Sequence, residues 1–397
     1  MNTCFLSLLL ALSAGAQRAQ IRSTLFVPDP LPALAPQSHG QFESTPGVIA
    51  ERVTYGTQFG MRVPAIVYSP KTHTGKLPAL IVVNGHGGDK YSWYAFYSGM
   101  MYALAGAVVV TYDPIGEGER NSERKSGTRA HDKLVPPPEM GRRMGGLMIT
   151  DLMQAVSYLS QRPDVDSRRI GAMGYSMGSF VLSLACAVET RLHACVLVGG
   201  GDLDGPDEYW DRSKPMCQGL PYQALQFLGD RPAAIYALHP ATLLYNGLED
   251  TVVDIPVHHM PPFFEDMRQR TIRLRGSEKG VFEYGFEPGA SHRPYFVTRP
   301  VALWLQRQLE FPNWTEEKVR TMPETHISEW AQAHHAEMDK LYATEQREGG
   351  ARALDTGIPV PARDDLNAVD PGAWRRDSDK YVLETWIREA KARVAAP

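Results

Sequence analysis

The chain has 397 residues, of which 43% are hydrophobic and 22% charged, and its formal net charge at pH 7 is −4. These proportions are ordinary for a soluble globular protein, and the length allows one large domain with additional elements, or two domains. The slightly negative charge argues against nucleic acid as a partner, because proteins that bind nucleic acid usually carry a basic surface.

A short apolar run opens the chain. Residues 5–12 read FLSLLLAL, which is too short to span a bilayer, and Ala14, Gly15 and Ala16 follow as a small-residue pattern that suits signal peptidase. We therefore expect residues 1–16 to be a signal peptide and the mature protein to begin at Gln17. The protein would then be exported to the periplasm or secreted, without a membrane span.

Three cysteines remain after the expected cleavage point: Cys186, Cys195 and Cys217. Cys186 and Cys195 lie in apolar segments, which favours buried thiols. An oxidising compartment would permit one disulfide bond among the three, but the odd number does not indicate a disulfide framework.

Residues 17–47 are rich in Pro, Ala and Gln with little periodicity, so we expect an extended segment that lies over the fold. Alternating β-favouring residues from 52 to 70 predict an antiparallel hairpin. After it, short apolar runs alternate with helical patterns as far as residue 311. The expected strands are 77–85, 106–113, 168–176, 193–200, 241–247 and 281–287, and the expected helices are 91–105, 144–163, 177–189 and 299–311.

This alternation predicts an α/β fold with a mostly parallel sheet and helices on both faces, formed by residues 48–311. An aromatic and Pro-rich insertion at about 201–240 interrupts the alternation and is expected to form a cap. Residues 312–397 are strongly charged with helical spacing, and we expect a packed helical appendage there, because their tryptophans favour burial. The alternative is a partly mobile tail.

The strongest motif is Gly174-Tyr175-Ser176-Met177-Gly178, which fits G-x-S-x-G. It lies between an expected strand and an expected helix, where the turn exposes the serine oxygen above the sheet edge. We therefore expect Ser176 to be a nucleophile.

A serine hydroxyl needs a base and an orienting acid, and in this fold the chain order is serine, acid, histidine. His292 follows the last expected strand and is the expected base. Asp250 lies three residues after Gly247 and is the expected acid, with Glu249 as its main rival and Asp254 in the same loop. The other histidines considered are expected at the surface or beside the site: His131, His193, His258, His259, His334 and His335.

The developing negative charge on the substrate would need backbone amides as donors. The amide of Met177, at the start of a helix, is one candidate. The second would come from the glycine-rich run Gly85-His86-Gly87-Gly88, where His86 and Gly87 remain alternatives. A purely structural glycine turn is the other interpretation of this run.

Together the segments NGHGG, YDPIGEGER, GYSMGS, NGLEDTVV and GASH resemble the α/β-hydrolase superfamily, in particular its branch of dienelactone hydrolases and bacterial acetyl xylan esterases. The resemblance covers residues 48–311 and implies hydrolysis of esters or lactones through an acyl-enzyme. The chain departs from dienelactone hydrolase, which has a cysteine where Ser176 stands. It also has Gly178-Ser179 in place of the double glycine of prolyl oligopeptidase-like peptidases.

We therefore expect a serine esterase that acts on a small-molecule or carbohydrate ester, with deacetylation of plant polysaccharide fragments as the finer expectation from the resemblance. An exported aminopeptidase or a thioesterase of the same fold is the first alternative, and a non-catalytic binding protein the second. The sequence shows no metal-ligand or dinucleotide motif, so no cofactor or metal is expected. The oligomeric state is not specified by the sequence.

Overall fold

A nine-stranded sheet forms the centre of the molecule in the computed structural model, which describes residues 13–133, 138–203, 215–341 and 351–394. Its strand order is β1-β2-β3-β5-β4-β6-β7-β8-β9. The strands are β1 (Gln37–Thr45), β2 (Val48–Gly56), β3 (Arg62–Pro70), β4 (Leu77–Val83), β5 (Val108–Tyr112), β6 (Val165–Tyr175), β7 (Ala194–Val198), β8 (Ala241–Gly247) and β9 (Glu283–Glu287).

The six strands from β5 to β9 in this order pair in parallel, while β1, β2 and β3 join the sheet in antiparallel fashion. The expected hairpin is the β2–β3 pair. Strand β4 lies between β5 and β6. The chain therefore runs from β4 to β5 on one side of it, and then crosses over to β6 on its other side. Such a switch point opens a crevice at the carboxyl ends of the strands, where α/β proteins bind their ligands.

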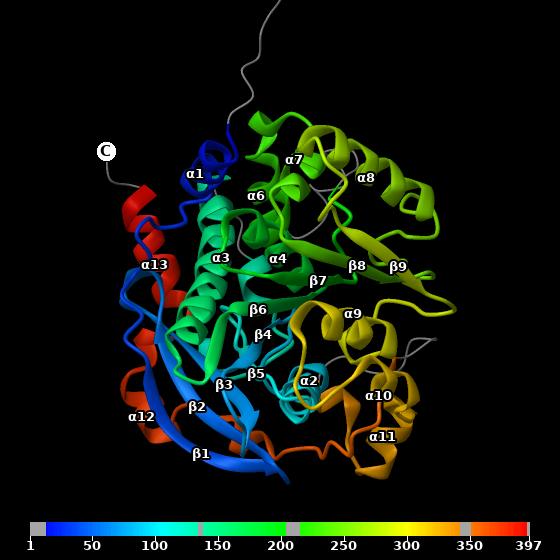
Figure 1. Cartoon of the computed structure of the whole chain (residues 1–397). Helices are drawn as coiled ribbons and strands as arrows, with labels where there is room; N and C mark the ends of the chain where they lie inside the picture. Colours follow the sequence, from blue (N-terminus) through cyan, green and yellow to red (C-terminus); the bar gives the residue numbers. More distant parts are fainter. Residues whose placement is uncertain (1–12, 134–137, 204–214, 342–350, 395–397) are drawn as a thin grey trace, which may run out of the picture.

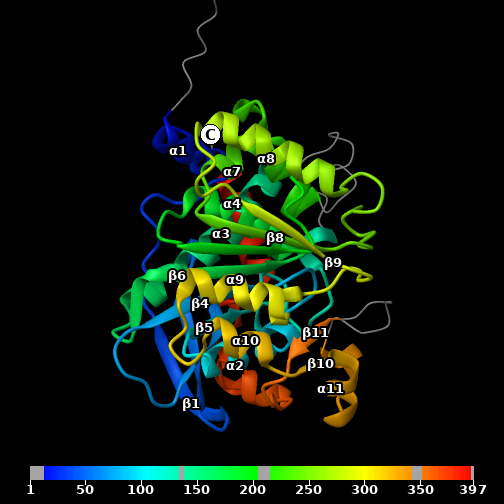
Figure 2. The ribbon, with the colours of Figure 1, turned by 45° about the vertical axis from the view of Figure 1, so that its right-hand side comes forward.

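Helices cover both faces of the sheet, as the alternation predicts (Figures 1 and 2). One face carries α2 (Trp93–Leu104) and α9 (Arg299–Leu309), followed by α10 (Glu316–Thr321) and α11 (Ile327–Ala333). The other carries α1 (Ala14–Thr24), α3 (Pro138–Gln161), α4 (Met177–Val188), α6 (Leu220–Gln223), α7 (Arg231–Ala237), α8 (Pro261–Arg275) and α13 (Leu383–Val394). Each face has its own apolar core, because strands buried on both sides need cover on both. No helix among these described residues is long and apolar enough to cross a membrane.

The N-terminal region differs from the expected extended segment. Residues 14–24 form α1, which docks on the sheet's helical cover through Ile21, and residues 37–45 add strand β1 to the sheet edge. The guanidinium of Arg18 fixes the helix by donating to the carbonyls of Ala187 and Leu238, at 3.1 Å each. The start of α1 includes the small-residue pattern at 14–16, whereas residues 1–12 lie outside the described part of the chain. The signal peptide therefore stays a prediction.

The expected cap lies between β7 and β8, and its residues 204–214 are outside the described part. The remainder forms a turn of π-helix (Pro215–Gly219), α6 and α7, all on the face of α3 and α4. The side chain of Cys217 is buried there. Cys186 of α4 and Cys195 of β7 form a disulfide bond instead of the two separate thiols favoured from their apolar surroundings.

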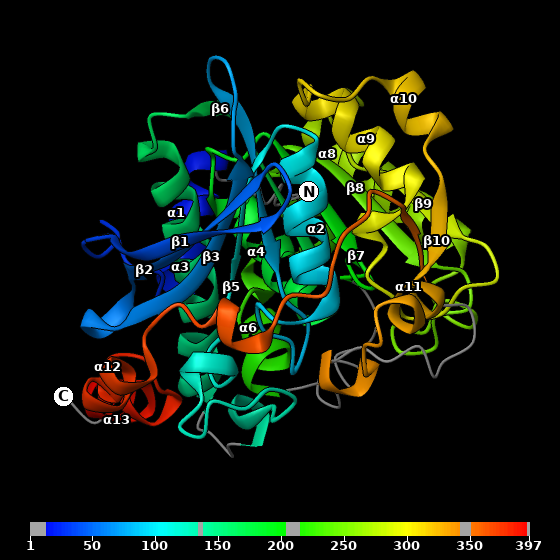
Figure 3. The ribbon, with the colours of Figure 1, turned by 90° about the horizontal axis from the view of Figure 1, so that it is seen from below.

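The C-terminal region packs against the sheet domain, and its helices confirm the helical expectation, although a small sheet was missed. Strands β10 (Glu324–His326) and β11 (Arg352–Leu354) pair antiparallel beside α11. From there the chain crosses to the opposite face, where α12 (Pro371–Arg376) and α13 lie (Figure 3). The tryptophans that favoured burial are buried, with exposed fractions of 5% or less: Trp314, Trp330, Trp374 and Trp386.

Candidate active site

Ser176 occupies a sharp turn between β6 and α4. Its backbone has φ 54° and ψ −117°, a left-handed conformation that is costly for a residue with a side chain. The turn is held because the Ser176 amide donates to the carbonyl of Val198, at the end of the neighbouring strand, over 2.9 Å. The side chain stays partly accessible although the residues around it are buried. A strained, partly exposed serine at a strand-to-helix turn fits the geometry expected of a nucleophile.

The two glycines of the motif are required by close backbone contacts. A Cβ atom on Gly174 would lie 2.3 Å from the carbonyl oxygen of Gly178, and one on Gly178 would lie 2.1 Å from the carbonyl oxygen of Val83. Neither contact can be relieved by turning a side chain, because both partners are main-chain atoms. The spacing of the motif therefore follows from the packing of α4 against β6 and β4.

Asp250 and His292 form a buried acid–base pair. The Nδ1 atom of His292 lies 2.7 Å from Oδ2 of Asp250, whose exposed fraction is 0%, and the histidine is 6% exposed. The other carboxylate oxygen, Oδ1, accepts from the amides of Val252 and Val253 at 2.9 and 3.2 Å. Both oxygens of Asp250 are thus used and its orientation is fixed. The rival carboxylate, Glu249, is exposed to solvent.

The loops that carry the acid and the base are joined through their backbones. The amide of Glu249 donates to the carbonyl of Ala290 over 3.0 Å. A Cβ atom on Gly247 would lie 2.2 Å from the carbonyl oxygen of Ser291, so the approach of the two loops requires a glycine at this position. The Asp250–His292 distance therefore depends on the packing of the ends of β8 and β9.

The imidazole of His292 lies beside the nucleophile turn. Its ring centroid is 5.0 Å from that of Tyr175, the residue before Ser176, and the Tyr175 hydroxyl donates to the His292 carbonyl over 3.2 Å. On the other side, a Cβ atom on Gly199 would lie 2.9 Å from Cε1 of His292. Gly199 directly follows the residue that binds the Ser176 amide. The structure thus brings all three expected triad residues to the carboxyl edge of the sheet.

The glycine-rich loop after β4 lies against the same turn. A Cβ atom on Gly85 would be 3.3 Å from Cβ of Ser176, and the loop closes by a hydrogen bond of 3.0 Å from the Gly88 amide to the Gly85 carbonyl. Met177 begins α4, where the helix dipole favours negative charge. Met177 and the loop that carries His86 and Gly87 therefore both adjoin the nucleophile turn, and the donor role of their amides remains a prediction.

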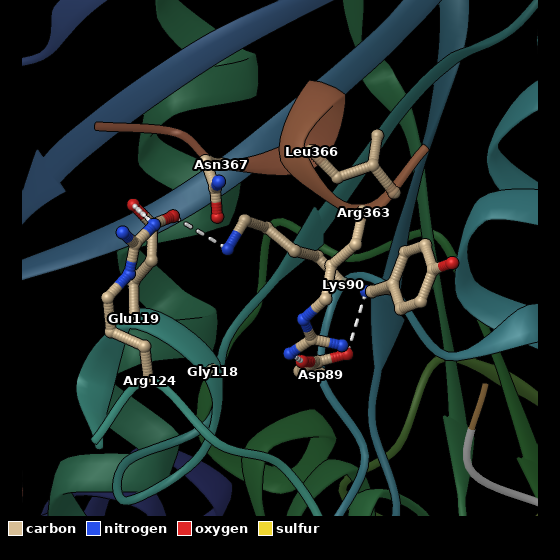
Figure 4. A pocket seen from close by; sticks show the side chains of 9 residues that line it. Asp89, Lys90, Gly118, Glu119, Arg124, Arg363, Leu366 and Asn367 are labelled. Carbon is tan, nitrogen blue, oxygen red and sulfur yellow. Dashed lines mark hydrogen bonds and ion pairs between the residues drawn. The ribbon is translucent and has the colours of Figure 1, made fainter. Parts of the chain in front are cut away.

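A buried ionic cluster supports the loops behind the glycine-rich turn. The ammonium of Lys90 lies 2.5 Å from Asp113 and 2.7 Å from Glu119, and Figure 4 shows Lys90 directed toward Glu119. Burial alone would lower the pKa of Lys90, but these carboxylates raise it above its usual value. The C-terminal segment is part of the cluster, because Arg363 contacts Asp89 at 2.8 Å beside a small pocket that Lys90 and Glu119 also line (Figure 4). Asp113 therefore braces these loops, since it binds both Lys90 and the amide of Glu119.

Arg120 serves the same purpose deeper in the fold. Its guanidinium is fully buried and pairs with Asp151 of α3 at 2.5 Å, while Thr57 donates to the second oxygen of that carboxylate. Arg120 therefore braces the sheet edge and does not face the crevice. The backbone amides of Thr128 and Arg129 likewise bind the buried carboxylate of Glu117, whose pKa burial raises to about 7.

A second group of chemically reactive side chains lies next to the glycine-rich loop. His86, His131, Asp132 and Cys217 place one donor atom each within 4.8 Å of one another. Burial lowers the pKa of His131 to about 4. Burial would raise the pKa of Asp132, but the hydrogen bond and charge of His86 outweigh it and lower the value to about 2. Sequence reasoning missed this group, because the chain shows no spacing typical of a metal motif.

Comparison with known proteins relates the chain to two families. Residues 41–198 match the family model Acetyl xylan esterase (AXE1), and residues 138–319 match the Prolyl oligopeptidase family. The first range includes Ser176 and the glycine-rich loop, and the second includes Ser176, Asp250 and His292.

Individual relatives share part of the sequence or the fold. The Bacillus subtilis protein YtaP, named as a hydrolase, is 29% identical over 147 residues, which cover 34% of this chain and 47% of YtaP. Acetyl xylan esterase 1 from Thermoanaerobacterium sp. aligns with a TM-score of 0.52 and 17% identity over 75% of this chain and 93% of the esterase. The methylesterase BT1017 aligns with a TM-score of 0.55 and 19% identity over 91% of this chain and 75% of that protein.

The strand order, the turn at Ser176 and these matches define an α/β hydrolase. The chain has the α/β-hydrolase fold, and the two family models support a serine hydrolase as its enzyme class. The match with the curated relative YtaP spans about half of that protein's length.

Proposed function

We propose that the protein hydrolyses carboxylic esters through an acyl-enzyme formed on Ser176. The observation that supports this most is the 2.7 Å contact between His292 and the fully buried Asp250, beside the strained turn that carries the serine. A buried carboxylate on Nδ1 fixes the tautomer in which Nε2 is free to accept a proton.

In the proposed reaction the Oγ atom of Ser176 attacks the acyl carbon while Nε2 of His292 takes the hydroxyl proton. Asp250 stabilises the imidazolium and is not itself protonated. The amide of Met177, with that of His86 or Gly87, donates to the oxyanion. His292 then returns the proton to the departing alcohol, and a water molecule, activated by the same imidazole, releases the acid and restores Ser176.

For the substrate we propose an acetyl or another small acyl ester of a carbohydrate, such as a plant polysaccharide fragment. The match of residues 41–198 to the acetyl xylan esterase model supports this choice, because that range holds the nucleophile and the glycine-rich loop. The signal-like sequence at residues 1–16 agrees with it, since an exported enzyme meets polymers that do not enter cells.

The test of this proposal compares Ser176→Ala with wild type on p-nitrophenyl acetate, longer acyl esters and acetylated xylan. We expect Ser176→Ala to lose the covalent route, leaving about 10³–10⁴-fold catalysis over water. Ser183→Ala is the matched control, because its hydroxyl serves only α4, donating to the Phe180 carbonyl at 2.7 Å. Fluorophosphonate labelling of another serine, with Ser176 unmodified, would contradict the assignment.

A serine peptidase is the second candidate, because the Prolyl oligopeptidase family model matches residues 138–319 and so includes the whole proposed triad. Aminoacyl p-nitroanilides assayed beside p-nitrophenyl acetate separate the two functions. A kcat/KM that is higher for the anilides would favour the peptidase. If Ser176→Ala loses both activities, Ser176 is the nucleophile in both reactions.

A further inference from the structure

Four potential metal ligands converge beside the proposed oxyanion loop from three separate segments. His86 comes from the loop after β4, His131 and Asp132 from the 3₁₀ turn Ala130–Lys133, and Cys217 from the π-helical turn after β7. His131 and Cys217 have exposed fractions of 0%, His86 of 5%, and the Asp132 side chain of 11%. The group is therefore closed off from solvent on nearly every side.

Their donor atoms are spaced as ligands around one ion. Nε2 of His86 lies 2.9 Å from Oδ2 of Asp132 and 3.1 Å from Sγ of Cys217. Asp132 Oδ1 is 3.2 Å from that sulfur and 3.6 Å from Nε2 of His131. Zinc binds nitrogen at ~2.0–2.1 Å and sulfur at ~2.3 Å in a tetrahedron, which sets neighbouring donor atoms roughly 3.3–3.7 Å apart. All four donor atoms lie within 4.8 Å of one another, so the most separated of them would close by up to about 1 Å when the ion binds.

Nucleophilic catalysis by Cys217 explains this arrangement poorly. In a Cys-His-Asp relay the thiol and the carboxylate meet opposite nitrogens of the imidazole. Here Cys217 and Asp132 both lie beside Nε2 of His86, and the thiol donates to Oδ1 of Asp132 instead of to a second imidazole nitrogen. In addition, the buried ring of His131 has the Ile115 backbone as its hydrogen-bonding neighbour, while its Nε2 lies 3.6 Å from Oδ1 of Asp132, beyond hydrogen-bond distance. A buried imidazole left in that state is costly unless another partner takes its nitrogen.

We propose that His86, His131, Asp132 and Cys217 form a tetrahedral zinc site. Two neutral imidazoles, one thiolate and one carboxylate balance the charge of Zn²⁺, and this nitrogen and sulfur donor set is suited to zinc rather than to calcium or magnesium. Four protein ligands leave no position for water or substrate, so the ion is structural. It ties the glycine-rich loop to the segment before α3 and to the insertion after β7.

The test measures metal content and metal spectra, which are independent of esterase activity. Purified wild-type protein is analysed for zinc by mass spectrometry, stripped with a chelator, and titrated with Zn²⁺ and with Co²⁺. We expect one equivalent to bind, with the visible bands of tetrahedral Co²⁺ and a thiolate-to-cobalt charge-transfer band, and the melting temperature to rise on adding Zn²⁺.

Cys217→Ser and His131→Asn each remove one ligand and leave the proposed triad untouched. Each should weaken metal binding by more than about 100-fold, and Cys217→Ser should abolish the charge-transfer band. His258→Asn is the control, because this histidine is exposed, lies outside the cluster and should keep full binding. If Cys217→Ser fails to fold, His131→Asn carries the test. Wild-type protein that binds no Zn²⁺ or Co²⁺, or variants that keep its stoichiometry and spectrum, would overturn the proposal.

Discussion

Replacing Asp250 by Asn tests the acid of the proposed triad with little change of shape. The Asn side-chain oxygen can still accept from the amides of Val252 and Val253, which now bind Asp250 at 2.9 and 3.2 Å. Its NH₂ group would then face Nδ1 of His292 in place of the carboxylate oxygen at 2.7 Å. Nδ1 must then accept a hydrogen bond, so the ring proton moves to Nε2. Nε2 is the atom that should take the proton of Ser176, and in this tautomer it cannot.

The expected loss of turnover is on the order of 10⁴, which corresponds to about 5 kcal/mol of transition-state stabilisation at ~1.36 kcal/mol for each factor of ten. Stability should fall less, by about 1.5–3 kcal/mol for one charge-assisted hydrogen bond. The assay is kcat on p-nitrophenyl acetate together with a melting curve, so that a defect of chemistry is separated from a defect of folding.

Glu249→Gln is the matched control, because its side chain is exposed and one position away in the same loop. It should keep nearly full activity. If Glu249→Gln lost activity and Asp250→Asn stayed active, the assignment of the acid would be wrong, while Ser176 and His292 would still stand.

Two further predictions concern the turn and the pH dependence of stability. In Gly178→Ala the new methyl group would lie 2.1 Å from the Val83 carbonyl oxygen. We therefore expect the unfolding free energy to fall by about 3 kcal/mol or more and most activity to be lost. A variant with the wild-type melting temperature and kcat would contradict this. His259 has its pKa raised to about 9, since the hydrogen bond and charge of Asp202 at 3.0 Å outweigh burial, which alone would lower it. The stabilisation that comes from a raised histidine pKa is fully present below the unfolded value of ~6.5 and disappears as the pH rises through about 9. His259→Asn should therefore destabilise the fold by on the order of 3 kcal/mol more at pH 6 than at pH 10. Chemical unfolding at both pH values measures this, and a pH-independent effect would refute it.

The sheet and the nucleophile turn could be predicted because their signals are local. The apolar runs of β4 and β5 are buried on both faces, and the glycines around Ser176 are needed within the same five residues. The helix α1 was not predicted, because its sequence is polar and Ile21 is its one buried residue. Its docking depends on carbonyls of Ala187 and Leu238, which lie far along the chain.

The spacing after Gly247 favoured Asp250 over Glu249 in the sequence, and the fold adds the difference in burial between them. Both carboxylates stand side by side in one loop, which pairs with the backbone of Ala290; Asp250 is buried there and Glu249 is exposed. The cluster around His86 and Cys217 was missed, since its members come from segments that meet only when the cap packs on the sheet.

The crossing of the C-terminal segment has a consequence for how the protein is made. The buried carboxylate of Glu119 accepts the amides of Ala368 and Val369 at 2.7 and 2.9 Å, and its carbonyl accepts the indole N–H of Trp374 at 2.8 Å. These partners leave the ribosome some 250 residues after Glu119. During synthesis Glu119 therefore lacks these C-terminal partners, and the edge of the sheet beside the glycine-rich loop stays open to water, until residues 368–374 have emerged.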